Sequence, residues 1–176
     1  NRETPMTDID RRHLLGALAV GGALATAGSA RAATTELALK DLKKEAPISC
    51  LYHCDFGDAK RFDAMLRNMN NHLDVYGFDP FAIKLVTVNH GPGVQYFLKD
   101  LAGTPWAEAK LDPEFPDPLA GLAKYGVEHY LCAITFKRLK IPTEQIREAP
   151  YVKLVPSGVA TVADLQSKGF AYLKSG

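Results

Sequence analysis

The chain has 176 residues, of which 47% are hydrophobic and 23% charged, and both values are ordinary for a globular protein. A formal net charge of +1 argues against a dedicated nucleic-acid surface and against an acidic carrier. There are three cysteines, and this odd number does not suggest a full disulfide framework, so at least one thiol is free or has a partner outside the domain.

Residues 1–32 have the features of a twin-arginine export leader. Arg11 and Arg12 precede an apolar run rich in Ala, Gly and Leu, and Ala30-Arg31-Ala32 is a small-residue cleavage site. The leader predicts a periplasmic protein. An uncleaved leader would instead anchor the chain in a membrane, with an apolar run of about 17 residues at the lower limit for spanning. Both alternatives stay open.

Residues 33–46 are polar and compatible with a helical surface arm, and residues 47–176 are predicted to form one domain. Ile48–Cys54 is the first strand, and its mostly apolar run is typical of a parallel strand buried on both faces. The period of two places Cys50, Tyr52 and Cys54 on one face and His53 on the other.

A helix is predicted over Ala59–Tyr76, with Asp58 as its N-cap. The second strand, Phe81–Val88, leads into the loop His90–Gly93 and a helix over Val94–Leu101. A glycine-rich loop between a strand and a helix exposes N–H groups that can hold an anion, although tight turns use the same residues.

Residues 103–118 form an irregular segment that contains four prolines and the only tryptophan, Trp106. Such a long loop in a small domain indicates an insertion, a lid or an oligomer contact. A short helix is predicted to follow over Leu119–Tyr125.

Cys132 lies between a predicted strand, Val127–Leu131, and a helix that ends at Leu139. The carboxyl ends of strands are where open α/β sheets bind ligands, and the first N–H groups of a helix favour a thiolate. The alternative is a cysteine that acts only as a small buried hydrophobic residue.

The chain ends with a strand over Tyr151–Val155, a helix over Thr161–Lys168 with Thr161 as N-cap, and a strand over Phe170–Lys174. Strands and helices alternate throughout. This alternation predicts a three-layer α/β/α fold with a five-stranded, mainly parallel sheet.

Several short motifs, in this order and spacing, resemble the DsrE/DsrF-like family. They are Tyr52-His53, Asn71-His72-Leu73, His90-Gly91-Pro92-Gly93, Cys132 with Thr135 and Arg138, Val155-Pro156-Ser157-Gly158-Val159, Leu165-Gln166 and Gly169-Phe170-Ala171-Tyr172. The resemblance implies sheet order 4-3-2-1-5, a homo-oligomer (trimer or hexamer), and a cysteine at position 132 that carries sulfur as a persulfide.

The resulting hypothesis is an exported protein that binds or relays sulfur through Cys132, with a sulfur donor or acceptor protein as partner and no cofactor. The predicted substrate-binding residues are His90, Gly91, Gly93, His53 and Cys54. The rival hypothesis is a non-catalytic, oligomeric binding or assembly subunit of a periplasmic or membrane-associated complex, with contacts made by residues 103–118.

Cys54 also ends a strand, so it could pair with Cys132 if their strands were neighbours, but not if another strand lay between them. The family's sheet order favours the second arrangement. His53, His90 and Cys54 gather at the same edge, yet no C-x-x-C or H-x-x-x-H spacing supports a metal site, and we predict none. Nucleotide-binding and hydrolase motifs are absent from the sequence.

Overall fold

Six strands form one parallel sheet in the computed structural model, which describes residues 34–111, 114 and 116–175. The predicted leader, residues 1–32, lies outside this described part. The strands are β1 (Thr35–Glu36), β2 (Ile48–Cys54), β3 (Ile83–Asn89), β4 (Glu128–Cys132), β5 (Val152–Val155) and β6 (Ala171–Lys174). Their order is β1-β5-β4-β3-β2-β6, and every neighbouring pair is parallel.

The prediction of five strands was wrong by one, because the polar arm contributes an edge strand. Thr35 pairs with Lys153 of β5, and the Leu37 N–H donates to the Leu154 carbonyl at 2.8 Å. An edge strand presents unpaired backbone groups that a short extended segment can satisfy, whatever its side chains are. The other five strands follow the order 4-3-2-1-5 that the sequence resemblance implied.

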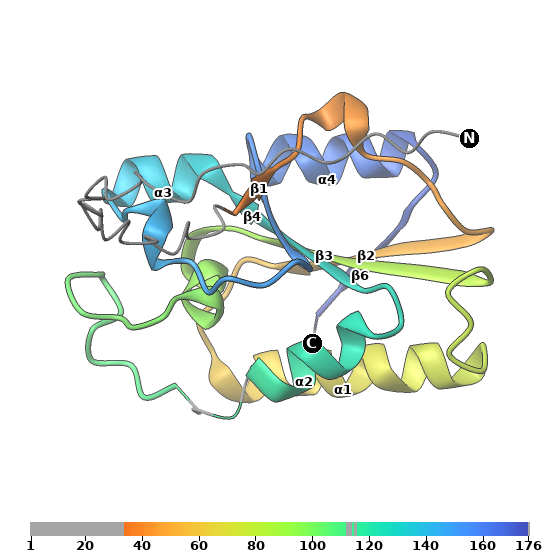
Figure 1. Cartoon of the computed structure of the whole chain (residues 1–176), viewed down its shortest axis with the longest axis horizontal. Helices are drawn as coiled ribbons and strands as arrows, with labels where there is room; N and C mark the ends of the chain where they lie inside the picture. The colour runs from red at the N-terminus through yellow and green to blue at the C-terminus, as the bar shows by residue number, and fades with distance from the viewer. Residues whose placement is uncertain (1–33, 112–113, 115, 176) are drawn as a thin grey trace, which may run out of the picture. The chain divides into compact units, whose positions relative to one another are not determined.

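Helices cover both faces of the sheet (Figure 1). In that view α1 (Ala59–Val75) and α2 (Pro116–Ala123) lie below the sheet, and α3 (Ala133–Leu139) and α4 (Gly158–Ser167) lie above it. Three short 3-10 helices complete the described elements: η1 (Leu39–Asp41), η2 (Gly91–Phe97) and η3 (Thr143–Gln145). The described residues form one compact unit.

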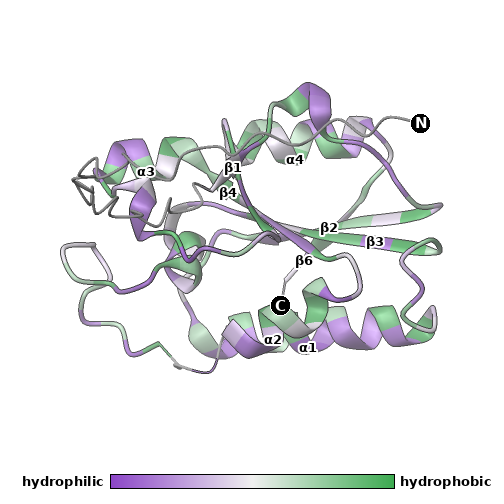
Figure 2. Cartoon of the chain, in the orientation of Figure 1, coloured by the Kyte–Doolittle hydropathy of each residue, from purple (hydrophilic) through white to green (hydrophobic). Residues whose placement is uncertain are grey.

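A hydrophobic cluster lies on each face of the sheet, between the strands and the helices. Helix α1 shows how the sequence builds one of them. Hydrophobic and hydrophilic segments alternate along this helix (Figure 2). Its buried residues are Phe62, Met65, Leu66, Met69 and Leu73, which is the stripe that helical spacing requires. This stripe packs with Cys50, Tyr52 and Cys54 of β2, whereas Leu51 belongs to the cluster beneath α4.

Three of the predicted helices differ from the structure in where they begin or in their type. α4 begins at Gly158, because the Ser157 hydroxyl accepts from the Ala160 N–H at 3.3 Å, and the predicted N-cap Thr161 is buried inside the helix. Prolines are tolerated in a first turn, so α2 begins at Pro116, within the predicted irregular segment.

The third difference is the segment predicted as a helix over Val94–Leu101. Its first residues, 94–97, belong to the 3-10 helix η2, and Leu98 then forms an antiparallel bridge with Ile146. No helix in the described part of the chain is long and apolar enough to span a bilayer.

Candidate functional site

Cys132 ends β4 and immediately precedes α3, at the carboxyl edge of the sheet. The residue is 5% exposed, so its surroundings bury most of it. Its thiol makes no capping hydrogen bond to α3. The junction predicted from the sequence is therefore present, and what the thiol can meet depends on the cavity beside it.

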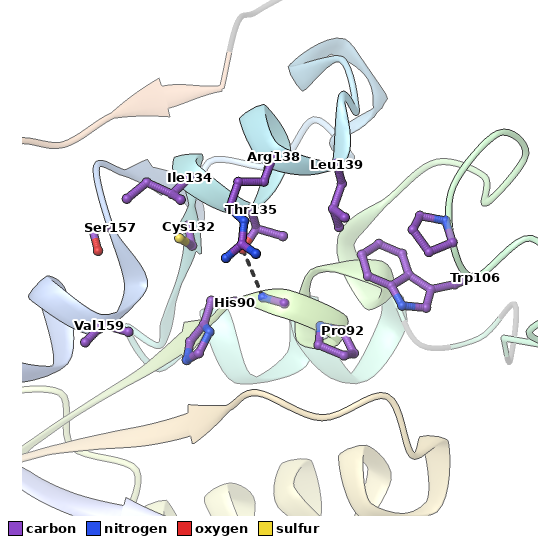
Figure 3. Close-up of a pocket in the computed structure, with 12 residues that line it drawn as sticks. His90, Pro92, Trp106, Cys132, Ile134, Thr135, Arg138, Leu139, Ser157 and Val159 are labelled. Carbon is purple, nitrogen blue, oxygen red and sulfur yellow. Dashed lines mark hydrogen bonds between the residues drawn. The ribbon is translucent and has the colours of Figure 1, made fainter.

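A cavity of about 450 Å³ lies against Cys132 (Figure 3). It is bounded by the loop after β3, both ends of α3, the start of α4 and part of the segment between η2 and α2. The lining residues are His90, Gly91, Pro92, Pro105, Trp106, Cys132, Ile134, Thr135, Arg138, Leu139, Ser157 and Val159. Of the predicted site residues, Cys132, His90 and Gly91 thus share one cavity, whereas His53, Gly93 and Cys54 do not line it.

The loop after β3 is tied to α3 by its own backbone. Gly91 has a φ of +53°, a conformation that favours glycine, and its N–H donates to the Thr135 hydroxyl at 2.9 Å. The Gly93 N–H donates to the His90 carbonyl at 3.1 Å. Two N–H groups that could have faced an anion are therefore used to hold the cavity wall in place.

Gly93 occupies a tightly packed position. A Cβ atom at this position would lie 2.2 Å from the Cys54 carbonyl oxygen and 2.9 Å from its sulfur. The chain can therefore pass over the end of β2 only where a side chain is missing.

Cys54 is fully buried beneath this crossing. Burial raises the pKa of its thiol to about 12, so the group stays protonated at neutral pH. Strand β3 lies between β2 and β4, and all three cysteines are free thiols. An intervening strand thus separates Cys54 from Cys132, which is the second of the two arrangements considered from the sequence.

His53 does not line the cavity, but it contacts His90, which does. The two Nε2 atoms are 2.6 Å apart and the rings stack with centroids at 4.8 Å. Nδ1 of His53 lies 2.9 Å from the Tyr172 hydroxyl. Burial is the main cause that lowers the pKa of His53. Asp55 opposes this shift, and His90 and Arg61 add to it.

Sequence reasoning undervalued Arg138 because it lies nearly two turns into α3. Figure 3 shows its side chain extending from the helix toward Thr135 and Cys132. Arg138 is exposed and makes no ion pair with any residue that the structure describes. Its guanidinium is a cation that remains available to an anion in the cavity.

Trp106 and Ser157 also line the cavity, and nothing in the local sequence connects them with Cys132. The site therefore combines a thiol, an imidazole, two hydroxyls and a guanidinium with apolar walls. This set suits a small anionic or sulfur-bearing group more than a nucleotide, which would need several free N–H donors for its phosphates.

Comparisons with known proteins agree with this architecture. A family model described as the DsrE/DsrF-like family matches residues 58–175. Among solved structures, a protein of unknown function from Methanobacterium thermoautotrophicum, MTH1491, is similar with a TM-score of 0.58 and 20% sequence identity. That similarity covers 72% of this chain and 98% of the other and concerns the fold alone. No curated protein matches the chain.

Proposed function

The chain belongs to the DsrE/DsrF-like family, and from this premise we propose that it binds or relays sulfur through Cys132. Family membership suggests a role in sulfur relay in general. The observation that carries the specific proposal is the position of Cys132 on the wall of a cavity shared with His90 and Arg138.

Sulfur transfer at this site is a simple exchange. The Cys132 thiolate attacks the outer sulfur of a donor persulfide, R–S–SH. A new S–S bond forms on Cys132, the donor S–S bond breaks, and the donor leaves as R–S⁻. The sulfane sulfur changes partner, so the step requires no external oxidant. The reverse exchange passes the sulfur to an acceptor thiol.

Arg138 and His90 have distinct roles in this proposal. The guanidinium stabilises the anionic sulfur species that enters or leaves, because it has no ion-pair partner among the described residues. His90 bounds the cavity on the side of β3 and can exchange a proton with the thiol or its persulfide.

Mass spectrometry of the intact protein after incubation with polysulfide tests the carrier role. We expect an adduct of about 32 Da, one sulfur atom, that reducing agent removes. The adduct should be absent from Cys132→Ser and present in Cys50→Ser, a matched control because Cys50 is equally buried but does not line the cavity of Cys132.

The same assay tests the role of Arg138. Arg138→Gln should load sulfur about 10-fold more slowly from an anionic donor, since one close charge–charge contact contributes on the order of 1–2 kcal/mol. Lys137→Gln, on the same helix but outside the cavity, should load normally. An adduct on Cys50 or Cys54 with none on Cys132 would sink the carrier proposal.

The second candidate function, a non-catalytic oligomeric assembly subunit, is favoured by the apolar rim of the cavity. Ile134, Leu139 and Val159 line it and are exposed, and Val159 is 68% exposed. We propose that this rim contacts a second copy of the chain or a partner protein. Native mass spectrometry of Val159→Asp should show a smaller assembly, and an unchanged assembly would rule out this contact.

We further propose that the protein is exported, because Arg11 and Arg12 precede an apolar run and the small-residue site Ala30-Arg31-Ala32. Cell fractionation of the full chain should place it in the periplasm or on the membrane. Replacement of both arginines by lysine should retain it in the cytoplasm, and equal export of the two forms would contradict the proposal.

A further inference from the structure

The Nε2 atoms of His53 and His90 face each other and cannot both be unprotonated without a cation between them. Their Nε2 atoms are 2.6 Å apart. Two imidazole lone pairs repel at this distance, so either one nitrogen carries a proton and donates it, or a cation lies between them. The contact joins the ends of two neighbouring strands, because His53 belongs to β2 and His90 directly follows β3.

Tyr172 can hold His53 in the form that binds a cation. Its hydroxyl lies 2.9 Å from Nδ1 of His53. When Nδ1 carries the ring proton and donates it to this oxygen, Nε2 keeps its lone pair and points it at His90. A hydrogen-bond partner on the far ring nitrogen is what orients histidine ligands in metal sites.

Asp55 adds the third donor and the negative charge. One ligand atom from each of His53, Asp55 and His90 lies within 4.8 Å of the others. Ligand atoms around one tetrahedral ion are roughly 3.3 Å apart, given bonds of about 2.0 Å. The two imidazoles therefore need to separate slightly and the carboxylate to approach. Asp55 is exposed on the loop after β2 and has room to do so.

The two histidines are held in place before any ion arrives. His53 pairs with Val88 on one side and Lys174 on the other. His90 packs against Gly158, where an added Cβ would lie 2.8 Å from the His90 Cβ. A site whose ligands are already positioned loses little conformational entropy when it binds an ion.

Arg61 is a nearby cation whose charge opposes a metal ion, although its side chain is tied to other groups. Its guanidinium donates to the Ser175 carbonyl and lies over the Phe56 ring, with Cζ 3.8 Å from the centroid. Cys54 is not a ligand, since its thiol is fully buried on the other face of β2.

We propose that His53, His90 and Asp55 form a binding site for a divalent transition-metal ion such as Zn²⁺. Imidazole and carboxylate donors suit Zn²⁺, and three protein ligands leave a coordination position open to solvent or a small ligand. Since His90 also lines the cavity of Cys132, the metal site adjoins that cavity. The site does not depend on the sulfur function proposed for Cys132.

Cobalt(II) titration of the metal-free full chain tests the site, because Co²⁺ replaces Zn²⁺ and its visible absorption reports nitrogen and oxygen ligands. We expect one equivalent to bind and Zn²⁺ to displace it. His53→Ala and His90→Ala should each weaken binding by 10-fold or more, and Tyr172→Phe by about 10-fold through loss of ring orientation. His72→Ala and Cys132→Ser should bind as the wild type does.

NMR of the histidine side chains tests the site in the wild-type protein, so the result does not depend on whether a variant folds. On addition of Zn²⁺ to the wild type, the imidazole signals of His53 and His90 should shift, while those of His72 and His129 stay in place. Absence of stoichiometric Co²⁺ binding would overturn the proposal, as would binding that persists in both His53→Ala and His90→Ala.

Discussion

Two buried positions, Gly93 and His129, limit the substitutions and the pH range that this domain tolerates. Gly93 is a glycine because the Cys54 carbonyl occupies the space of a side chain. His129 is a fully buried imidazole on β4. The sequence alone does not reveal either constraint, because both arise from contacts in the folded domain.

Gly93→Ala should destabilise the domain by about 1–3 kcal/mol, because its Cβ would lie 2.2 Å from backbone that cannot move without disturbing β2. Gly121→Ala is the matched control. Gly121 lies in α2 and an added Cβ would meet nothing within 4 Å, so alanine should stabilise the helix by up to about 1 kcal/mol. Urea unfolding measures both, and equal stability of the two variants would contradict the steric argument.

His129 should make the domain sensitive to acid. Burial lowers its pKa to about 3, and its Nδ1 is 2.8 Å from the Thr87 hydroxyl. In the unfolded chain the ring takes up a proton near its ordinary pKa of 6.5. The folded state cannot, so the stability present above pH 6.5 is lost as the pH falls toward 3, by at most about 1.4 kcal/mol per pH unit.

His129→Asn tests this prediction, because an amide can keep the hydrogen bond to Thr87 without titrating. Its free energy of unfolding should fall less steeply than that of the wild type between pH 6.5 and pH 4. Parallel pH profiles for the two proteins would show that His129 is not the group responsible.

At the scale of elements, helix α1 follows from local signals. Asp58 caps it by accepting from the Arg61 N–H at 2.8 Å, as its position before an amphipathic stretch predicted. The same reasoning failed for α4, where Ser157 and Thr161 are both good caps. Only packing selects the first, since it places Thr161 in the interior.

Asp58→Ala should lower the free energy of unfolding by about 1 kcal/mol, because it leaves a helix N–H without its acceptor. Asp58→Asn retains a side-chain oxygen at the cap and should stay close to the wild type. Thermal unfolding followed by circular dichroism measures both, and identical losses would show that the charge of Asp58 matters more than its hydrogen bond.

At the scale of the whole molecule, the cavity joins four segments that are distant in sequence. Trp106, the only tryptophan, shares its wall with Cys132. A thionitrobenzoate group attached to Cys132 should therefore quench the emission of Trp106. Labelling with dithionitrobenzoate under native conditions should lower the fluorescence and release one chromophore rapidly, from Cys132 in the cavity. Cys50, which does not line the cavity, and the fully buried Cys54 should react later.

Cys132→Ser is the control for this measurement and should show neither the rapid release nor the rapid loss of emission. Quenching that develops at the same rate in the variant would mean that a different thiol reacts first. That outcome would indicate a cavity closed to reagents of this size.

The sequence by itself determined the alternation of strands and helices and the place of Cys132 between β4 and α3. These features arise from hydrophobic periodicity and local capping, which are properties of neighbouring residues. The family resemblance added the order of the five main strands. The edge strand β1 could not be predicted from a hydrophobic pattern, because it has two residues and forms only by pairing with the backbone of β5.

Only the tertiary structure decided which side chains meet. It placed Arg138 and Trp106 around the same cavity as Cys132 and brought His53 to His90. It also showed that Cys54 and Gly93 serve packing. The physical reason is that these contacts join residues on separate strands and loops, whose spacing along the chain carries no information about their distance until the sheet order and register are set.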